Sequence, residues 1–186
     1  MTRYRTIVAD PPWDHSDGTG ISAADGTAYG PGCVGHSITK VPYACMSVQE
    51  IANLPVDRLA ESSAHLYLWT TNRYLRDAYD VAKSWGFTVT KPLVWCKAPK
   101  GFMGGAFTSS AEFCLFCRRG SLSTLARAGR QWWEWPRSTH SVKPEAFLDL
   151  VEQVSPGPYL ELFARRQRLG WDTWGNEALP HVEMPA

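Results

Sequence analysis

Short apolar runs alternate along the chain with stretches in which apolar residues recur at helical spacing. Four runs are mostly apolar and end at turn or polar residues, as buried strands do. They cover residues 5–9, 65–69, 112–118 and 159–164. Residues 87–97 predict a further strand, or a pair of strands around Pro92.

Helix signals lie between these runs. Residues 47–50 have the spacing of a capping box and predict a short helix that ends before Pro55. From a candidate N-cap at Asn72, apolar residues recur at helical spacing until Gly86. A third helix is expected to begin at Pro144. Strands that alternate with helices predict an α/β fold with a mostly parallel sheet.

The length fits one domain. A chain of 186 residues can form one sizeable core, and neither an internal repeat nor a dividing linker is visible. We therefore expect residues 1–186 to form a single domain without a separate target-recognition domain. Residues 14–35 are rich in Gly, Ser, Asp and Thr, which predicts a long loop of a length usually reserved for function.

Composition is near the globular average, with 44% hydrophobic and 20% charged residues, which excludes a disordered or fibrous chain. The net charge of +1 is unevenly distributed. Residues 118–168 hold nine basic and five acidic side chains, and most of the basic ones are Arg. Such a zone can follow phosphates, or it can be a solvated face with scattered ion pairs. Charge alone leaves both interpretations open.

Cysteine usage and hydropathy indicate a cytoplasmic protein. The five cysteines are irregularly spaced, unlike a secreted disulfide framework, and Cys114 and Cys117 lack a second pair at zinc-finger spacing. No metal cluster is expected. No apolar run reaches the length of a membrane span, and residues 1–10 lack the apolar stretch of a signal peptide.

The sequence Asp10-Pro11-Pro12-Trp13 follows the first predicted strand. The carboxylate accepts hydrogen bonds, the prolines have no N–H, and the indole offers a flat surface. These groups match an exocyclic amine on a planar base, whose lone pair they would hold outward. The alternative is a turn that ends the strand, with Asp10 as its cap and Trp13 in the core.

Further landmarks follow the tetrad in order along the chain. They are Pro42-Tyr43 with Met46, Leu68-Trp69-Thr70, Val94-Trp95-Cys96-Lys97, Glu112-Phe113-Cys114-Leu115, Arg137-Ser138-Thr139-His140-Ser141-Val142-Lys143-Pro144-Glu145, Ser155-Pro156-Gly157, Glu161-Leu162-Phe163-Ala164-Arg165 and Gly175-Asn176. Together with the tetrad, these landmarks resemble the MT-A70 family of S-adenosylmethionine-dependent adenine methyltransferases, whose bacterial and phage members are taken to modify DNA. The resemblance implies a Rossmann-like methyltransferase fold with helices on both faces of the sheet and the permuted β-type motif order.

The resemblance also implies roles for individual residues. Residues 10–13 would be catalytic and hold the target amine, with Asp10 also near the cofactor. On the substrate side, Tyr43 would contact the base or gate the pocket, and His140 matches the family. Lys143 would pair with the cofactor carboxylate, and Glu161 would bind the ribose. The other cofactor contacts implied are Arg165, Gln167, Asn176 and Glu177.

The sequence thus predicts a methyltransferase that transfers the methyl group of S-adenosylmethionine to adenine in nucleic acid, with DNA favoured over RNA. Arg118, Arg119 and the stretch from Arg127 to Trp135 would face the phosphates and bases of the substrate. A homodimer, or a heterodimer with a related subunit, is compatible with the family, and no membrane partner is expected. Two alternatives remain: a methyltransferase-like partner subunit with little activity, and methylation of the N(4) amine of cytosine.

Overall fold

The computed structural model describes residues 2–13, 45–98, 107, 110–136, 142–175 and 182–185. Within them, seven strands form one sheet in the order β5-β3-β4-β2-β1-β6-β7. Its centre is made by β1 (Tyr4–Ala9), β2 (Ala60–Thr70) and β6 (Tyr159–Leu162), and β7 (Trp171–Trp174) closes one side. The other side consists of β4 (Ala111–Arg119), β3 (Thr88–Ala98) and β5 (Trp132–Pro136).

The sheet is mostly parallel, as predicted. The neighbours β1 and β2, β1 and β6, β6 and β7, and β3 and β5 are parallel pairs. Among the described strands only β4 runs against its neighbours, antiparallel to both β2 and β3. The carboxyl ends of the other strands and the amino end of β4 therefore lie along the same edge, which we call the carboxyl edge.

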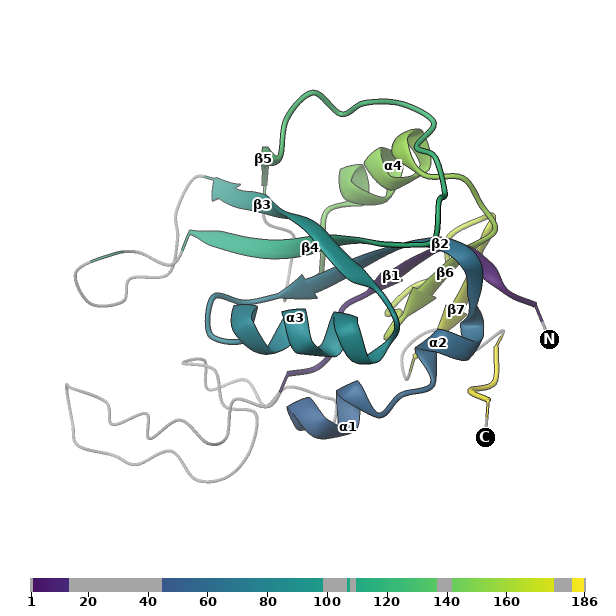
Figure 1. Ribbon diagram of the computed structural model, residues 1–186. Helices are drawn as coiled ribbons and strands as arrows, with labels where there is room; N and C mark the ends of the chain where they lie inside the picture. Colours follow the sequence, from purple (N-terminus) through teal and green to yellow (C-terminus); the bar gives the residue numbers. More distant parts are fainter. Residues whose placement is uncertain are drawn as a thin grey trace, which may run out of the picture.

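Helices cover both faces of the sheet, which is also as predicted (Figure 1). One face carries α1 (Val48–Ala52), α2 (Val56–Leu59) and α3 (Leu75–Ser84), which pack over a core that includes Ile7, Leu66 and Trp85. The opposite face carries α4 (Glu145–Val154) over a smaller core rich in aromatic side chains.

The predicted capping box opens α1. Glu50 donates its backbone N–H to the Ser47 hydroxyl at 3.2 Å, and Ser47 donates its own N–H to the Glu50 carboxylate at 2.7 Å. The N-cap predicted at Asn72 is wrong, because α3 starts after Tyr74, which makes no side-chain capping bond. Gly86 does end that helix, with a φ of 80° that favours glycine.

Four strands refine or differ from the prediction. β3 is one strand through Pro92, because β5 pairs with it only from Val94 onward and leaves the proline without an outer neighbour. The strand β6 ends at Leu162 rather than 164, since Phe163 turns into the left-handed region with a φ of 62°. β5 and β7 were not predicted as strands, because their alternating tryptophans have no long apolar run.

Candidate active site

Four charged side chains meet at the carboxyl edge on the α4 face, and we call them the edge cluster. Asp10 directly follows β1, Lys143 precedes α4, Glu112 is the second residue of β4 and Lys97 is the last but one of β3. The Lys143 Nζ lies 2.7 Å from Oδ2 of Asp10 and 3.4 Å from Oε2 of Glu112. Lys97 pairs with the other oxygen of Glu112. Negative and positive charges therefore alternate across four segments of the chain.

The edge cluster is largely withdrawn from water. Its side chains are only 17% to 23% exposed, so the charges interact more strongly than surface pairs do. Burial opposes a charge on Lys143, but Asp10 and Glu112 outweigh it and raise the lysine pKa above its usual value. Burial likewise acts to raise the pKa of Glu112, and Lys143 and Lys97 outweigh it and lower that pKa. Both shifts favour the ionised forms of Lys143 and Glu112.

Aromatic rings form the floor under the edge cluster. The Lys143 ammonium lies 5.3 Å from the centre of the Trp69 ring, and the Lys97 ammonium 5.1 Å from that of Trp95. The Trp69 and Trp95 rings meet edge to face, with centroids 6.1 Å apart. Phe147 of α4 also packs on Trp69, with ring centroids 4.6 Å apart. The rings fix the lysine heads without taking up their hydrogen bonds.

The backbone of the tetrad at residues 10–13 is fixed locally. Asp10 donates its N–H to the carbonyl of Leu162 at 3.4 Å, which ties the tetrad to the end of β6. The Pro11 carbonyl accepts the N–H of Trp13, and the Pro12 carbonyl that of Met46, both at 2.9 Å. Each prolyl carbonyl thus has one lone pair engaged and a second one left for another donor.

Trp13 lies in the core rather than on an open surface. It is 5% exposed, its indole N–H donates to the Trp69 carbonyl at 3.0 Å, and its ring stacks on Tyr74 at 5.4 Å. These contacts match the structural alternative that the sequence left open for this residue. Because they hold residues 10–13 against β2, Trp13 positions the carboxylate of Asp10.

Glu161 is the most unusual acid at this edge. Its Oε2 is buried and has no hydrogen-bond partner among the described residues. Burial raises the pKa of Glu161 to about 7, an effect that Asp10 adds to and Arg166 opposes. Glu161 pairs in register with Val8, so it faces the same side of the sheet as Asp10. An unpartnered buried carboxylate oxygen indicates a ligand that donates hydrogen bonds.

Close backbone packing shapes the turn after β6. A Cβ on Gly175 would lie 2.4 Å from the Ala164 carbonyl oxygen, so only glycine fits there. Ala164 in turn donates its N–H to the Trp174 carbonyl at 3.0 Å. The ends of β6 and β7 are therefore pressed together beside Glu161.

A family model described as MT-A70 matches residues 4–177, which is nearly the whole chain. The chain belongs to the MT-A70 family. This confirms the predicted family, the Rossmann-like fold and the enzyme class of a methyltransferase. The order of parts also agrees, since Asp10 follows the first strand and Glu161 lies in a later one.

Relatives of known name agree with the family. The chain is 31% identical to the Mycoplasma type II methyltransferase M.MunI, over 98% of this chain and 82% of that protein. It is 26% identical to the mouse N(6)-adenine-specific methyltransferase METTL4, over 97% of this chain but only 39% of the relative. An Arabidopsis non-catalytic subunit, MTB, is 22% identical over 65% of this chain and 15% of its own length. The chain thus spans most of the bacterial relative and a minor part of the plant and mouse proteins.

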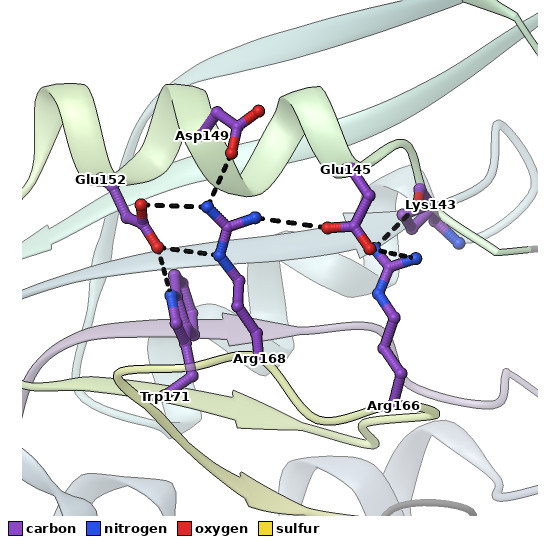
Figure 2. Close-up of polar contacts among 7 residues, drawn as sticks. All are labelled: Lys143, Glu145, Asp149, Glu152, Arg166, Arg168 and Trp171. Carbon is purple, nitrogen blue, oxygen red and sulfur yellow. Dashed lines mark hydrogen bonds and ion pairs between the residues drawn. The ribbon is translucent and has the colours of Figure 1, made fainter.

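Arg166 and Arg168, which follow β6, bind carboxylates of α4 (Figure 2). We call these two arginines, together with Glu145, Asp149 and Glu152, the α4 clamp. Arg168 contacts three carboxylates of that helix at 2.6 to 3.2 Å, those of Glu145, Asp149 and Glu152. Arg166 pairs with Glu145 at 2.8 Å and donates to the Lys143 carbonyl at 3.3 Å. Figure 2 also shows the Trp171 indole N–H on Glu152, at 2.6 Å. The clamp fixes the segment that carries Lys143.

Several predicted residues do not lie at this site. Arg118 and Arg119 end β4 at the opposite edge of the sheet, where they donate to the carbonyls of Leu122 and Asp57 at 2.6 and 2.8 Å. The structure therefore does not bring them to Asp10. Arg165 is half-buried and Gln167 exposed just beyond β6. Tyr43, His140, Asn176 and Glu177 lie outside the described residues.

In this MT-A70 protein, sequence reasoning missed Lys97 and Glu112 as members of the site. Both stand in segments that match family landmarks, and both are lone charges at the end of an apolar strand. A single charge at the end of an apolar strand was the sequence feature that could have identified these two residues. Their proximity depends on the antiparallel register of β3 and β4, in which Trp95 pairs with Glu112.

Within the described ranges, no group of three or more His, Cys, Asp or Glu side chains is arranged to hold a metal. The helices of that same part of the chain are too short to cross a membrane. Cys96, Cys114 and Cys117 are free thiols, whereas Cys45 is disulfide-bonded.

Proposed function

We propose that this protein is an S-adenosylmethionine-dependent methyltransferase whose active site is the carboxyl edge around Asp10, and that its substrate is the N(6) amine of adenine in nucleic acid. Adenine as the target is supported by the family and by the mouse relative. DNA is favoured over RNA, because the bacterial members that the sequence resembles are taken to modify DNA and the Mycoplasma relative is bacterial. The observation that carries the proposal is the carboxylate of Asp10, held by Lys143 at 2.7 Å at the end of β1.

Asp10 is suited to orient an amine. Lys143 binds its Oδ2, and no described residue hydrogen-bonds its Oδ1, which is left to accept an N–H of the target base. The free lone pairs on the carbonyls of Pro11 and Pro12 lie next to it in sequence. Two acceptors on one amino group would hold its nitrogen lone pair toward the reacting methyl group, which is catalysis by positioning.

The residues present fit the cofactor. When bound, S-adenosylmethionine supplies an electrophilic methyl group on a sulfonium. The unpartnered Oε2 of Glu161 suits a ribose hydroxyl, which is a donor. The Lys143 ammonium has three N–H donors and uses two on Asp10 and Glu112, so one is left for the cofactor carboxylate. Glu112 and Lys97 act as positioning residues for Lys143.

The other predicted contacts enter the proposal with their sequence roles. Arg165 and Gln167, which follow β6, are proposed for the cofactor from the family resemblance. Asn176 and Glu177 are proposed for the cofactor, and Tyr43 and His140 for the base, from the family resemblance. We leave Arg118 and Arg119 out of the site because of their place at the opposite edge.

We also propose that residues 1–186 act as one domain, with the cytoplasm as the compartment. Pairing with a second methyltransferase-like chain is supported by the match to MTB, a subunit named as non-catalytic. The same match supports a second candidate function for this chain, that of a partner subunit. Against this role, Asp10, Lys143 and Glu161 are all retained and placed together.

Product analysis tests the proposal. The protein is incubated with methyl-labelled S-adenosylmethionine and with DNA or RNA of mixed sequence, and the digested nucleosides are separated. We expect label in N(6)-methyl-2′-deoxyadenosine from DNA. Label in N(4)-methyl-2′-deoxycytidine would favour the cytosine alternative. No label in any nucleoside, with no binding of the cofactor by calorimetry, would support the partner-subunit role instead.

A further inference from the structure

A cavity of about 650 Å³ lies away from the edge cluster, on the α4 face of the sheet. Its walls come from the loop between β4 and β5, the start of β5, the middle of β3 and the end of α4. The volume is within the range of small-ligand sites. The described residues proposed above for the methyl-transfer site do not line it.

The chemistry of the lining is basic and aromatic. Lys91, Arg127 and Arg130 line the cavity, and no carboxylate is among the described residues around them. All three are exposed, and none forms an ion pair or hydrogen bond with another described residue. Trp132 and Trp133 lie beside them, and the Trp132 side chain is 50% exposed. Unpaired cations next to accessible indoles suit a ligand that has both a phosphate and a planar base.

The wall formed by residues 120–131 is held at several points, so the cavity is preformed. The Leu122 carbonyl accepts from the ring of buried His65 at 3.1 Å. Leu125 donates its N–H to the Val154 carbonyl, and the Gln131 carbonyl accepts from Val94, both at 2.8 Å. A ligand would not have to order this wall on binding, which favours affinity.

A continuous aromatic path connects the cavity with the edge cluster. Trp133 stacks on Trp135 with ring centroids 5.6 Å apart and an interplanar angle of 8°. Trp135 meets Phe147 at 6.4 Å, and Phe147 packs on Trp69 beneath Lys143. The strand β5 runs from the cavity toward the carboxyl edge, because it is parallel to β3. A strand of nucleic acid that follows β5 from the cavity therefore reaches the carboxyl edge beside Lys97, the member of the edge cluster that pairs in register with Trp135.

We propose that this cavity binds a nucleotide of the nucleic-acid substrate outside the target adenine, with its phosphate on Arg127 and Arg130 and its base against Trp132. The inference rests on the function proposed above, to which it adds a substrate subsite. Two of the positive charges of residues 118–168, those of Arg127 and Arg130, would then bind the substrate, whose strand would lie on the β5 side of the sheet.

The test compares a variant that lacks two arginines of the cavity with a control variant that lacks two cations on another surface of the protein. The variant Arg127→Ala/Arg130→Ala removes two exposed cavity arginines, and the control Arg76→Ala/Lys83→Ala removes two exposed cations of α3 on the other face of the sheet. Binding of a fluorescent single-stranded oligonucleotide is measured against salt without cofactor, and methyl transfer is measured separately. The slope of log affinity against log salt should fall by about 0.7 for each phosphate that the cavity variant no longer neutralises, and stay unchanged in the control.

Trp132 supplies a second arm. Trp132→Ala should raise the KM for nucleic acid by roughly tenfold, and Trp132→Phe should restore most of it, because any aromatic face stacks on a base. The KM for the cofactor and the melting temperature should not change in either variant. A weakening that phenylalanine does not rescue would contradict a stacking role.

The outcomes separate the subsite from the function. A cavity variant whose salt slope and KM equal those of the wild type and the control would overturn the subsite while methyl transfer stands. If the wild type binds adenosine monophosphate and the cavity variant does not, while the KM for the oligonucleotide is unchanged, the subsite is also overturned, in favour of a free nucleotide. Wild-type protein without methyl transfer would instead refute the proposed function, and the salt slopes measured without cofactor still decide on the cavity.

Discussion

The edge cluster and the α4 clamp are both groups of charged side chains, but they differ in whether hydrogen-bonding atoms near them are left without a partner among the described residues. The edge cluster is 17% to 23% exposed, and beside it lies a buried Glu161 oxygen without a partner in the described part of the chain. In the α4 clamp, Arg168 is paired three times, and the carboxylates of Glu145 and Asp149 are 58% and 65% exposed. The clamp is complete without a ligand, whereas the edge retains free donors and acceptors.

Charge density along the sequence is therefore a poor guide to the site. Arg165, Arg166 and Arg168 form the densest basic stretch, yet two of the three bind the helix packed beside them. The edge cluster draws one charge from each of four distant segments. Unsatisfied groups in a shielded place mark the functional region better than the number of charges does.

Among the variants that compare the edge cluster with the α4 clamp and the rest of the surface, the largest effect is expected for Lys143, which both carboxylates of the edge cluster share. Lys143→Met removes the charge between Asp10 and Glu112 and should weaken cofactor binding and methyl transfer by roughly 100-fold, since bonds to charged groups contribute about 1.5–3 kcal/mol each. Calorimetry with the cofactor and single-turnover rates measure it. Lys83→Met on α3 is the matched control and should behave like the wild type. A Lys143→Met protein with normal cofactor affinity would contradict the proposed role of Lys143 in binding the cofactor.

Glu161→Gln should separate stability from function. The pKa of Glu161 is about 7 in the folded protein against an ordinary value of 4.5, so folding takes up a proton and the wild type loses stability as the pH rises from 4.5 through 7. The variant should therefore melt at a higher temperature than the wild type at pH 8 and at a similar one at pH 4.

The same variant tests cofactor binding. If the ionised carboxylate accepts from the ribose, wild-type affinity should rise with pH below 7, by up to about tenfold per pH unit. Glu161→Gln should bind more weakly at pH 8 and lose this pH dependence. A variant that is more stable at pH 8 and still binds the cofactor normally would show that Glu161 is merely a buried acid.

Arg168→Met tests the α4 clamp and should act on stability alone. We expect a decrease of about 1 kcal/mol in the free energy of unfolding at pH 7, a small value because water screens the exposed carboxylates. The bond to Arg168 lowers the pKa of Glu152, so this contribution is present above pH 4.5 and disappears as the pH falls through the lowered pKa. Urea denaturation at pH 7 and pH 3 measures the difference. A decrease that is the same at both pH values would contradict the ion-pair account.

Arg118→Ala should have the smallest effect. The side chain is exposed and donates to one loop carbonyl, so the free energy of unfolding should change by less than about 0.5 kcal/mol. Oligonucleotide binding and its salt dependence should match the wild type. A reduced salt slope would return this residue to the substrate surface that the sequence predicted.

Short sequence motifs predicted those features of the fold and the site that are determined by residues close together in the chain. The capping box of Ser47 and the placement of Asp10 and Glu161 at strand ends follow from short motifs and turns. Glu112 and Lys97 were missed because a strand register determines their meeting, and apolar spacing carries no register between strands. The α4 clamp had a signal that was not used: Glu145, Asp149 and Glu152 share one helical face.

The most direct test of the central claim is single-turnover methyl transfer by Asp10→Asn beside the wild type, with labelled S-adenosylmethionine and DNA. Asparagine keeps the shape of the side chain but presents one acceptor where the carboxylate presents two, and it loses the charge that faces Lys143. We expect label in N(6)-methyl-2′-deoxyadenosine for the wild type and a rate lower by about 10² to 10⁴ for the variant, with an unchanged circular dichroism spectrum. A folded Asp10→Asn protein that transfers the methyl group at the wild-type rate would contradict it.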